Sequence, residues 1–255
     1  MINTERCWAS TLGNCSNKMS REHLISKGVF KEKKASVHGF SWCKDRFATV
    51  GIESLTSKIL CSKHNNDLSV VDNGGIEAVD AIEKLIHLCN ERKHSSPSSF
   101  EVISLNVDGY LFERWLLKVV LNLSFQNKDK IGGMGEVPGI PPLYLLHVVF
   151  GKIKFSHYMG VYHLVTDGSC VKTDSEIVIV PIVKDSTIGV FYISIYSIDF
   201  LLSLTPAKPP ENLRSMGVSG LPNHILDAKW LYRVHEMTAA KGGIKSHEVV
   251  FNWKN

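Results

Sequence analysis

The chain has 255 residues, of which 44% are apolar and 21% are charged, an ordinary balance for one large globular domain or two smaller ones. No apolar run reaches the roughly 18 residues that a membrane-spanning helix needs. The N-terminus also lacks the basic and then apolar segments of a secretory signal. The composition argues against a spanning protein, and we expect a cytoplasmic one without a membrane partner.

The net charge of +4 is unevenly distributed along the chain. Residues 1–69 hold eleven Lys and Arg against six Asp and Glu, whereas the rest of the chain holds eighteen against nineteen. A basic module joined to a neutral domain is typical of a protein that contacts the phosphate backbone of a nucleic acid. A solvated lysine-rich loop at residues 31–34 explains the same charge equally well.

The first 70 residues show little periodicity and only short apolar fragments, as in a small module that needs a metal to hold it together. Apolar positions then recur at helical spacing over residues 73–92, and a Ser- and Pro-containing break follows. These patterns predict an N-terminal module at residues 1–72, a helical linker at 73–95 and a C-terminal domain at 96–255.

The C-terminal domain begins with a predicted strand at residues 100–107 and a helix at 111–125, in which apolar residues lie four apart on one face. A Gly- and Pro-rich loop follows at 132–142. Further strands are predicted at residues 143–149, 161–166, 176–183, 188–197 and 248–253, and a short helix after residue 223. Residues 184–187 predict a hairpin turn. The fold class is therefore α+β, with a mainly antiparallel sheet.

Four of the six cysteines lie in the basic first quarter of the chain: Cys7, Cys15, Cys43 and Cys61. In a reducing compartment, clustered cysteines indicate metal ligands before disulfides. Cys61 and His64 can place a thiolate and an imidazole on one zinc ion. Cys7 and Cys15 are the nearest upstream pair, but they are further apart than the roughly two to four residues usual between zinc ligands, so Cys43 is a rival for either place. Four reduced cysteines without a metal are the alternative.

Two fragments follow the upstream cysteines: Glu22-His23 with an apolar pair after it, and Cys61-x-x-His64-Asn65. Together with these cysteines, residues 5–72 resemble the HNH, or ββα-metal, endonuclease family. In that family a cysteine pair precedes a strand with an acidic residue and a histidine, and a Leu-Cys-x-x-Cys-Asn/His segment opens a helix. The resemblance covers little more than a quarter of the chain, and it implies a small zinc-stabilised ββα-metal module.

The resemblance also implies a role for each matching residue. His23 would be the general base that takes a proton from the attacking water. Glu22 and Asn65 would hold a catalytic Mg²⁺ or Mn²⁺ ion, with Asn66 as the rival of Asn65. The zinc at the four Cys and His ligands would be structural and would take no part in the chemistry.

The sequence departs from the family pattern at one important position. No asparagine lies between His23 and His64, although the family uses one there to steady the loop that carries the base. His38, Thr56 and Ser57 are the candidates to replace it. This departure leaves an alternative open, a zinc-stabilised module that binds nucleic acid or protein without cutting it.

We expect a metal-dependent endonuclease that hydrolyses phosphodiester bonds of DNA or RNA, with double-stranded DNA as the favoured partner. The resemblance also implies a role in bacterial defence against phage. The C-terminal domain is expected to bind substrate, a regulatory signal, a protein partner or a second copy of the chain. A small-molecule enzyme in this domain has the least support from the sequence.

Overall fold

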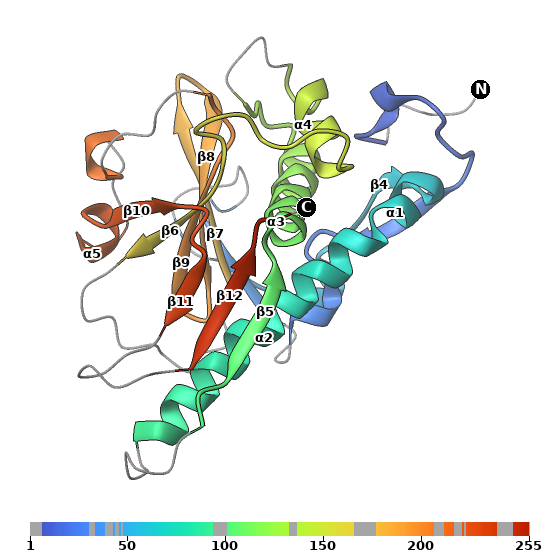
Figure 1. Ribbon diagram of the computed structural model, residues 1–255. Helices are drawn as coiled ribbons and strands as arrows, with labels where there is room; N and C mark the ends of the chain where they lie inside the picture. The colour runs from blue at the N-terminus through green and yellow to red at the C-terminus, as the bar shows by residue number, and fades with distance from the viewer. Residues whose placement is uncertain are drawn as a thin grey trace.

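The computed structural model has an α+β fold with mixed helices and antiparallel sheets, as the sequence predicted. It describes residues 7–30, 34–38, 43, 46, 48–93, 101–132, 137–165, 177–206, 212–216, 221, 223–238 and 247–254. Helix α3 lies at the centre, and Figure 1 shows the large sheet on one side of it and β4 and α1 on the other. The N-terminal elements and the large sheet therefore share one buried helix.

The described elements follow one another along the chain in the order that Figure 1 colours from blue to red. The strands are β1 (Met19–His23), β2 (Lys34–Val37), β3 (Ala48–Gly51), β4 (Thr56–Cys61), β5 (Ser104–Asp108), β6 (Gly160–Val165), β7 (Ile177–Lys184), β8 (Thr187–Ile195), β9 (Ile198–Ser203), β10 (Lys229–Tyr232), β11 (Glu236–Thr238) and β12 (Glu248–Asn252). The α-helices are α1 (Ser62–Asp67), α2 (Ser69–Lys93), α3 (Gly109–Asn127), α4 (Leu143–Val149) and α5 (Asn223–Leu226). Short 3-10 helices are η2 (Ser10–Leu12), η3 (Lys27–Val29), η4 (Ile52–Ser54) and η6 (Arg214–Met216).

β1 and β4 form a separate antiparallel pair that leads directly into the helices. Met19 lies opposite Cys61 at one end of the pair, and His23 lies opposite Thr56 at the other. β4 runs straight into α1, and α2 follows after one further residue. The second strand of the antiparallel pair is thus followed directly by a helix at Cys61, and a segment of residues 24–55 connects the two strands.

The large sheet has the strand order β10-β6-β9-β8-β7-β2-β3. Its neighbouring strands are antiparallel except for β2 and β7, which are parallel. The predicted hairpin between β7 and β8 is confirmed, and Asp185 and Ser186 at its turn both have positive φ, as a two-residue type I′ turn requires. β2 and β3 come from the expected N-terminal module, so the module and the C-terminal domain contribute strands to one sheet.

Helix α3 is confirmed where the apolar spacing predicted it, and it holds the layers together. The helix begins after β5 because the Asp108 carboxylate accepts a hydrogen bond of 2.9 Å from the backbone N–H of Leu111. Phe112 packs against Phe200 of the large sheet at 5.3 Å between ring centroids. On another side α2 approaches so closely that a side-chain carbon at Gly75 would lie 2.1 Å from the indole of Trp115.

The predicted strand at residues 143–149 is wrong, because this segment forms helix α4. Its buried residues are Leu145, Leu146, Val148 and Val149, which is the spacing of one helical face. A short apolar run does not distinguish a buried strand from a buried helix by periodicity alone. Pro142 stands at the N-cap of α4 and ends the preceding loop.

The other predicted elements lie within a few residues of the observed ones. The linker helix α2 begins at Ser69, four residues before the predicted start, and β5 is shorter than the strand expected at residues 100–107. The remaining predicted strands correspond to β6, β7, β8 and β12. The predicted end at residue 166 and the predicted start at residue 176 lie outside the described residues. No described helix combines the length and the apolar character needed to cross a membrane.

Candidate metal centre

Four side chains that the sequence singled out converge where β4 meets α1. The Sγ atoms of Cys7, Cys15 and Cys61 and a ring nitrogen of His64 all lie within 4.8 Å of one another. From the Nδ1 atom of His64, the three sulfurs are 3.4, 3.7 and 3.4 Å away, in the same order. The rival ligand Cys43 is buried but does not belong to this group.

The spacing of these atoms fits a zinc ion. With Zn–S bonds of about 2.3 Å and a Zn–N bond of about 2.0 Å, a tetrahedral site separates sulfur from nitrogen by about 3.5 Å. The observed separations of 3.4–3.7 Å match that edge. The cluster could therefore hold a metal such as zinc. Because four protein ligands fill a tetrahedron, such a site is of the closed, structural type.

Local hydrogen bonds and packing explain why the ligands converge. The backbone N–H of Cys61 donates to the sulfur of Cys7 at 3.4 Å, and the N–H of His64 donates to the sulfur of Cys61 at 3.5 Å. Next to Cys7, the backbone N–H of Trp8 donates to the carbonyl of Ile59 at 3.0 Å and adds the N-terminal segment to the edge of β4. The segment around Cys7 is therefore fixed against β4 by backbone contacts.

In the absence of a metal, burial favours the protonated thiol at two of the three cysteines. Burial raises the pKa of the Cys7 thiol to about 12 and also raises the pKa of Cys15. Burial acts in the same direction on Cys61, but the backbone N–H groups of His64 and Ser16 outweigh it, so that the pKa of Cys61 falls below its ordinary value. Burial lowers the pKa of His64, which keeps its imidazole neutral. A bound divalent cation would stabilise the other two thiolates and displace their protons.

His23 lies at the far end of the β1–β4 pair, opposite Thr56, and its Nε2 atom is buried. Its side chain is 28% exposed, and its Nε2 atom has no hydrogen-bond partner among the described residues. The nearest carboxylate oxygen, from Glu53, is 3.9 Å away, and Lys27 forms an ion pair with the same Glu53 side chain. Arg21 is exposed nearby, and its Nε atom donates to the hydroxyl of Thr56, opposite His23.

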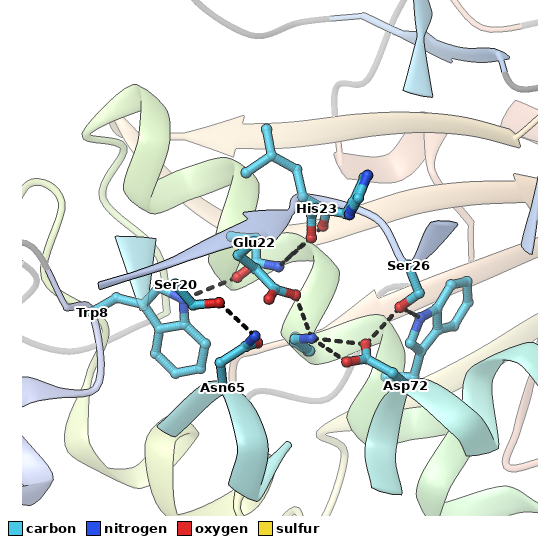
Figure 2. A network of polar contacts seen from close by, with 11 residues as sticks. Trp8, Ser20, Glu22, His23, Ser26, Asn65 and Asp72 are labelled. Atoms are coloured by element: carbon cyan, nitrogen blue, oxygen red, sulfur yellow. Dashed lines mark hydrogen bonds and ion pairs between the residues drawn. The ribbon is translucent and has the colours of Figure 1, made fainter. Parts of the chain in front are cut away.

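Glu22 points away from His23, because successive residues of a strand face opposite sides. Figure 2 shows its carboxylate directed toward the helices, whereas the imidazole of His23 lies on the other face of β1. The carboxylate is buried and forms an ion pair of 2.7 Å with Lys118 of α3. Lys118 also contacts both carboxylate oxygens of Asp72 at 2.7 and 2.6 Å. The structure thus brings Glu22 to Lys118 and Asp72, and not to His23.

Asn65 is half-buried on α1, on the same side of β1 as Glu22. Its side-chain amide donates to the hydroxyl of Ser20 at 3.0 Å. Its rival Asn66 is exposed. Asn65 and Glu22 thus lie on the same side of β1, and each contacts a different partner.

A residue that the sequence reasoning missed steadies the strand that carries His23. Asn122 of α3 donates to the carbonyl oxygen of Leu24 at 3.1 Å, with a longer contact of 3.5 Å to that of His23. Its own Oδ1 atom accepts the indole N–H of Trp8 at 2.9 Å. Lys118 and Asn122 are four residues apart in an apolar helix, which places both on one face. Two polar residues four positions apart in an apolar helix are the sequence signal from which Lys118 and Asn122 could have been identified.

The three residues considered as replacements for the missing asparagine have other contacts. The hydroxyl of Thr56 accepts a hydrogen bond from Arg21, and the hydroxyl of Ser57 donates to Gln126 of α3. The backbone N–H of His38 donates to the carbonyl of Ile179, beside the large sheet. Thr56 and Ser57 thus contact the His23 strand from β4, and Asn122 contacts it from α3 through the carbonyl groups of His23 and Leu24.

Comparison with known proteins gave no matching family model, no matching curated protein and no matching solved structure.

Proposed function

We propose that the protein is an endonuclease of the ββα-metal kind that hydrolyses phosphodiester bonds of nucleic acid, with His23 as its general base. The observation that supports the proposal most directly is the Nε2 atom of His23, which has no hydrogen-bond partner among the described residues. His23 lies at one end of the β1–β4 strand pair, and the metal centre lies at the other. A polar atom without a hydrogen bond is rare in a native interior and calls for an explanation, of which a catalytic role is one. The strand pair running into a helix at Cys61 supports the same proposal.

The proposed chemistry uses the imidazole as a proton acceptor. An imidazole can accept and release a proton near neutral pH. Nε2 of His23 would take one proton from a water molecule, whose oxygen bonds to phosphorus as the bond from phosphorus to the 3′ oxygen breaks. The leaving oxygen would take up a proton from solvent. Asn122 would position the base by holding the carbonyl groups of His23 and Leu24.

Positive charge near His23 supports a phosphate-containing substrate. Arg21 is exposed on the strand that carries His23, and Lys27 lies beside Glu53 with its side chain 55% exposed. Such side chains contribute affinity for a phosphate backbone irrespective of sequence. Double-stranded DNA remains the favoured substrate in the proposal, while a cytoplasmic location, a role in phage defence and a partner of the C-terminal part remain predictions.

The proposed catalytic Mg²⁺ or Mn²⁺ ion does not fit Glu22 and Asn65 as they stand. When bound, such an ion would polarise the scissile phosphate. Glu22 is instead paired with an ammonium group, and Asn65 is turned to Ser20. The residues therefore do not form an oxygen-lined site open to a divalent cation.

A second candidate function is a zinc-stabilised module that binds nucleic acid or protein without cutting it. The ion pair between Glu22 and Lys118 favours this second function, because a module that does not cut nucleic acid has no need of a free carboxylate for binding a metal. The two functions differ in whether His23 acts on a substrate.

Nicking of supercoiled plasmid DNA tests the proposal. Purified protein is assayed with Mg²⁺, with Mn²⁺ and with EDTA beside His23→Ala, and His87→Ala serves as a matched control because His87 is exposed on α2. Zinc content and thermal stability are matched first. We expect the wild type and His87→Ala to nick DNA at equal rates and His23→Ala to be at least about 100-fold slower.

Equal cleavage by the wild type and His23→Ala would show that His23 is not the base. If neither cuts DNA or RNA and both bind it with equal affinity, the non-cutting module is the correct function.

A further inference from the structure

Lys118 is more deeply buried than the two carboxylates with which it pairs, Glu22 and Asp72, and has an exposed fraction of 1%. Its ammonium group contacts three carboxylate oxygens, one from Glu22 at 2.7 Å and two from Asp72 at 2.7 and 2.6 Å. An ammonium group has three N–H donors, and each has one of these oxygens within reach. β1, α2 and α3 thus assemble an oxygen-lined site that is filled by a cation belonging to the chain itself.

The charges of this network do not cancel. One ammonium faces two carboxylates, so one negative charge is left over in a largely buried place. Asp72 receives one further hydrogen bond, from the hydroxyl of Ser26 at 2.6 Å, and that hydroxyl accepts the indole N–H of Trp115 at 2.9 Å. The hydroxyl of Ser26 and the indole of Trp115 are neutral groups, so neither balances the remaining negative charge. Burial also raises the pKa of Glu22 in spite of the nearby lysine, as expected for an incompletely balanced carboxylate.

A divalent cation would satisfy the same oxygens and balance both charges, since Mg²⁺ and Mn²⁺ prefer carboxylate oxygens. We propose that the Lys118 ammonium occupies the position of a divalent cation between Glu22 and Asp72, and that it keeps such a cation out of the site. The inference rests on the proposed function, because Glu22 is the carboxylate that the family resemblance would make a metal ligand and that Lys118 occupies in this structure. Lys118 therefore competes with a divalent cation for the carboxylates of Glu22 and Asp72.

The side chain of Asp72 is 23% exposed, whereas that of Glu22 is 8% exposed. A cation from solvent would thus reach the site from the side of Asp72. To bind Glu22 it would have to displace the ammonium from all three of its contacts. Removing the lysine charge should therefore convert a closed site into an open one without adding any new ligand.

Binding of Mn²⁺ to the full-length, zinc-loaded protein tests the proposal, with free Mn²⁺ measured by electron paramagnetic resonance. The variants are Lys118→Met and Lys118→Gln, and Lys184→Met is the matched control because Lys184 is exposed at the end of β7. We expect Lys118→Met to bind one Mn²⁺ ion at least about 100-fold more tightly than the wild type does. Adding Glu22→Gln to Lys118→Met should abolish this binding.

Thermal unfolding gives a second readout. Lys118→Met leaves the buried carboxylate of Glu22 and the partly buried carboxylate of Asp72 without their cation, so this variant should melt at a lower temperature. Mn²⁺ should restore its melting temperature and leave that of the wild type and of Lys184→Met unchanged. Lys118→Gln retains hydrogen-bond donors and keeps the test decisive if the methionine variant does not fold.

Two results would overturn the proposal. In the first, the wild type binds Mn²⁺ as tightly as both Lys118 variants do, and Glu22→Gln abolishes this binding. The other is the absence of additional Mn²⁺ binding in folded Lys118 variants. Neither result depends on nucleic-acid cleavage, so a failure here is distinguishable from a failure of His23→Ala in the nicking assay.

Discussion

Replacement of Cys15 by alanine removes one ligand of the metal centre with little loss of packing, because Cys15 is the only one of the four that is not fully buried. Structural zinc contributes an apparent free energy of about 10–16 kcal/mol. If the four ligands contribute equally, one ligand accounts for about 2.5–4 kcal/mol. Zinc affinity should therefore fall by a factor of about 10²–10³ in Cys15→Ala.

Competition with a chromogenic chelator measures this affinity, and urea unfolding at a fixed concentration of free zinc measures the loss of stability that accompanies it. Cys43→Ala is the matched control, because Cys43 is a buried cysteine outside the cluster. It should keep one zinc ion at the wild-type affinity. Undiminished zinc affinity in Cys15→Ala, or loss of zinc in Cys43→Ala, would refute the assigned ligand set.

Two further predictions concern stability. Asn122→Ala leaves the buried indole N–H of Trp8 and the carbonyl of Leu24 without the Asn122 side chain as partner. Each lost hydrogen bond should lower the free energy of unfolding by about 1–3 kcal/mol. A total loss below about 1 kcal/mol in urea unfolding would contradict this role of Asn122. Burial lowers the pKa of His163 from its ordinary 6.5 to about 4. Protonation therefore favours the unfolded chain, and stability should fall by up to about 3 kcal/mol as the pH drops from 6.5 to 4. His163→Phe should flatten this part of the pH profile, and an unchanged profile would exclude His163 as its source.

The sequence was most informative where chemistry and spacing are local. Cys61 and His64 are three residues apart at the start of a helix, so their convergence on one metal follows from local geometry. Cys7 and Cys15 were identified because a tetrahedral site needs two more ligands. Helix α3 was predicted from its apolar residues four apart, and the hairpin between β7 and β8 from its turn residues.

The ion network could not be predicted, because its partners are distant in sequence. Glu22 and Lys118 are 96 residues apart, and only the packing of β1 against α3 brings them together. Taken alone, Glu22 beside His23 looked like a metal ligand. The alternation of a strand turns Glu22 to the face opposite His23, where it meets Lys118 of α3.

The helix α4 and the placement of β2 and β3 show two other limits. A seven-residue apolar run such as that of α4 is compatible with either a strand or a helix, and tertiary packing decides between them. β2 joins the sheet through a parallel pairing with β7, about 140 residues further along the chain. No local pattern specifies so distant a partner.

The N-terminal strand pair and the proposed chemistry both depend on the metal centre, so its direct measurement is the most decisive one. X-ray absorption at the zinc edge of the purified protein gives the type and number of ligands. We predict one zinc ion per chain with three sulfur ligands at about 2.3 Å and one nitrogen ligand at about 2.0 Å. A shell of four sulfurs, a shell dominated by oxygen, or protein that binds no zinc when zinc is supplied would contradict the account.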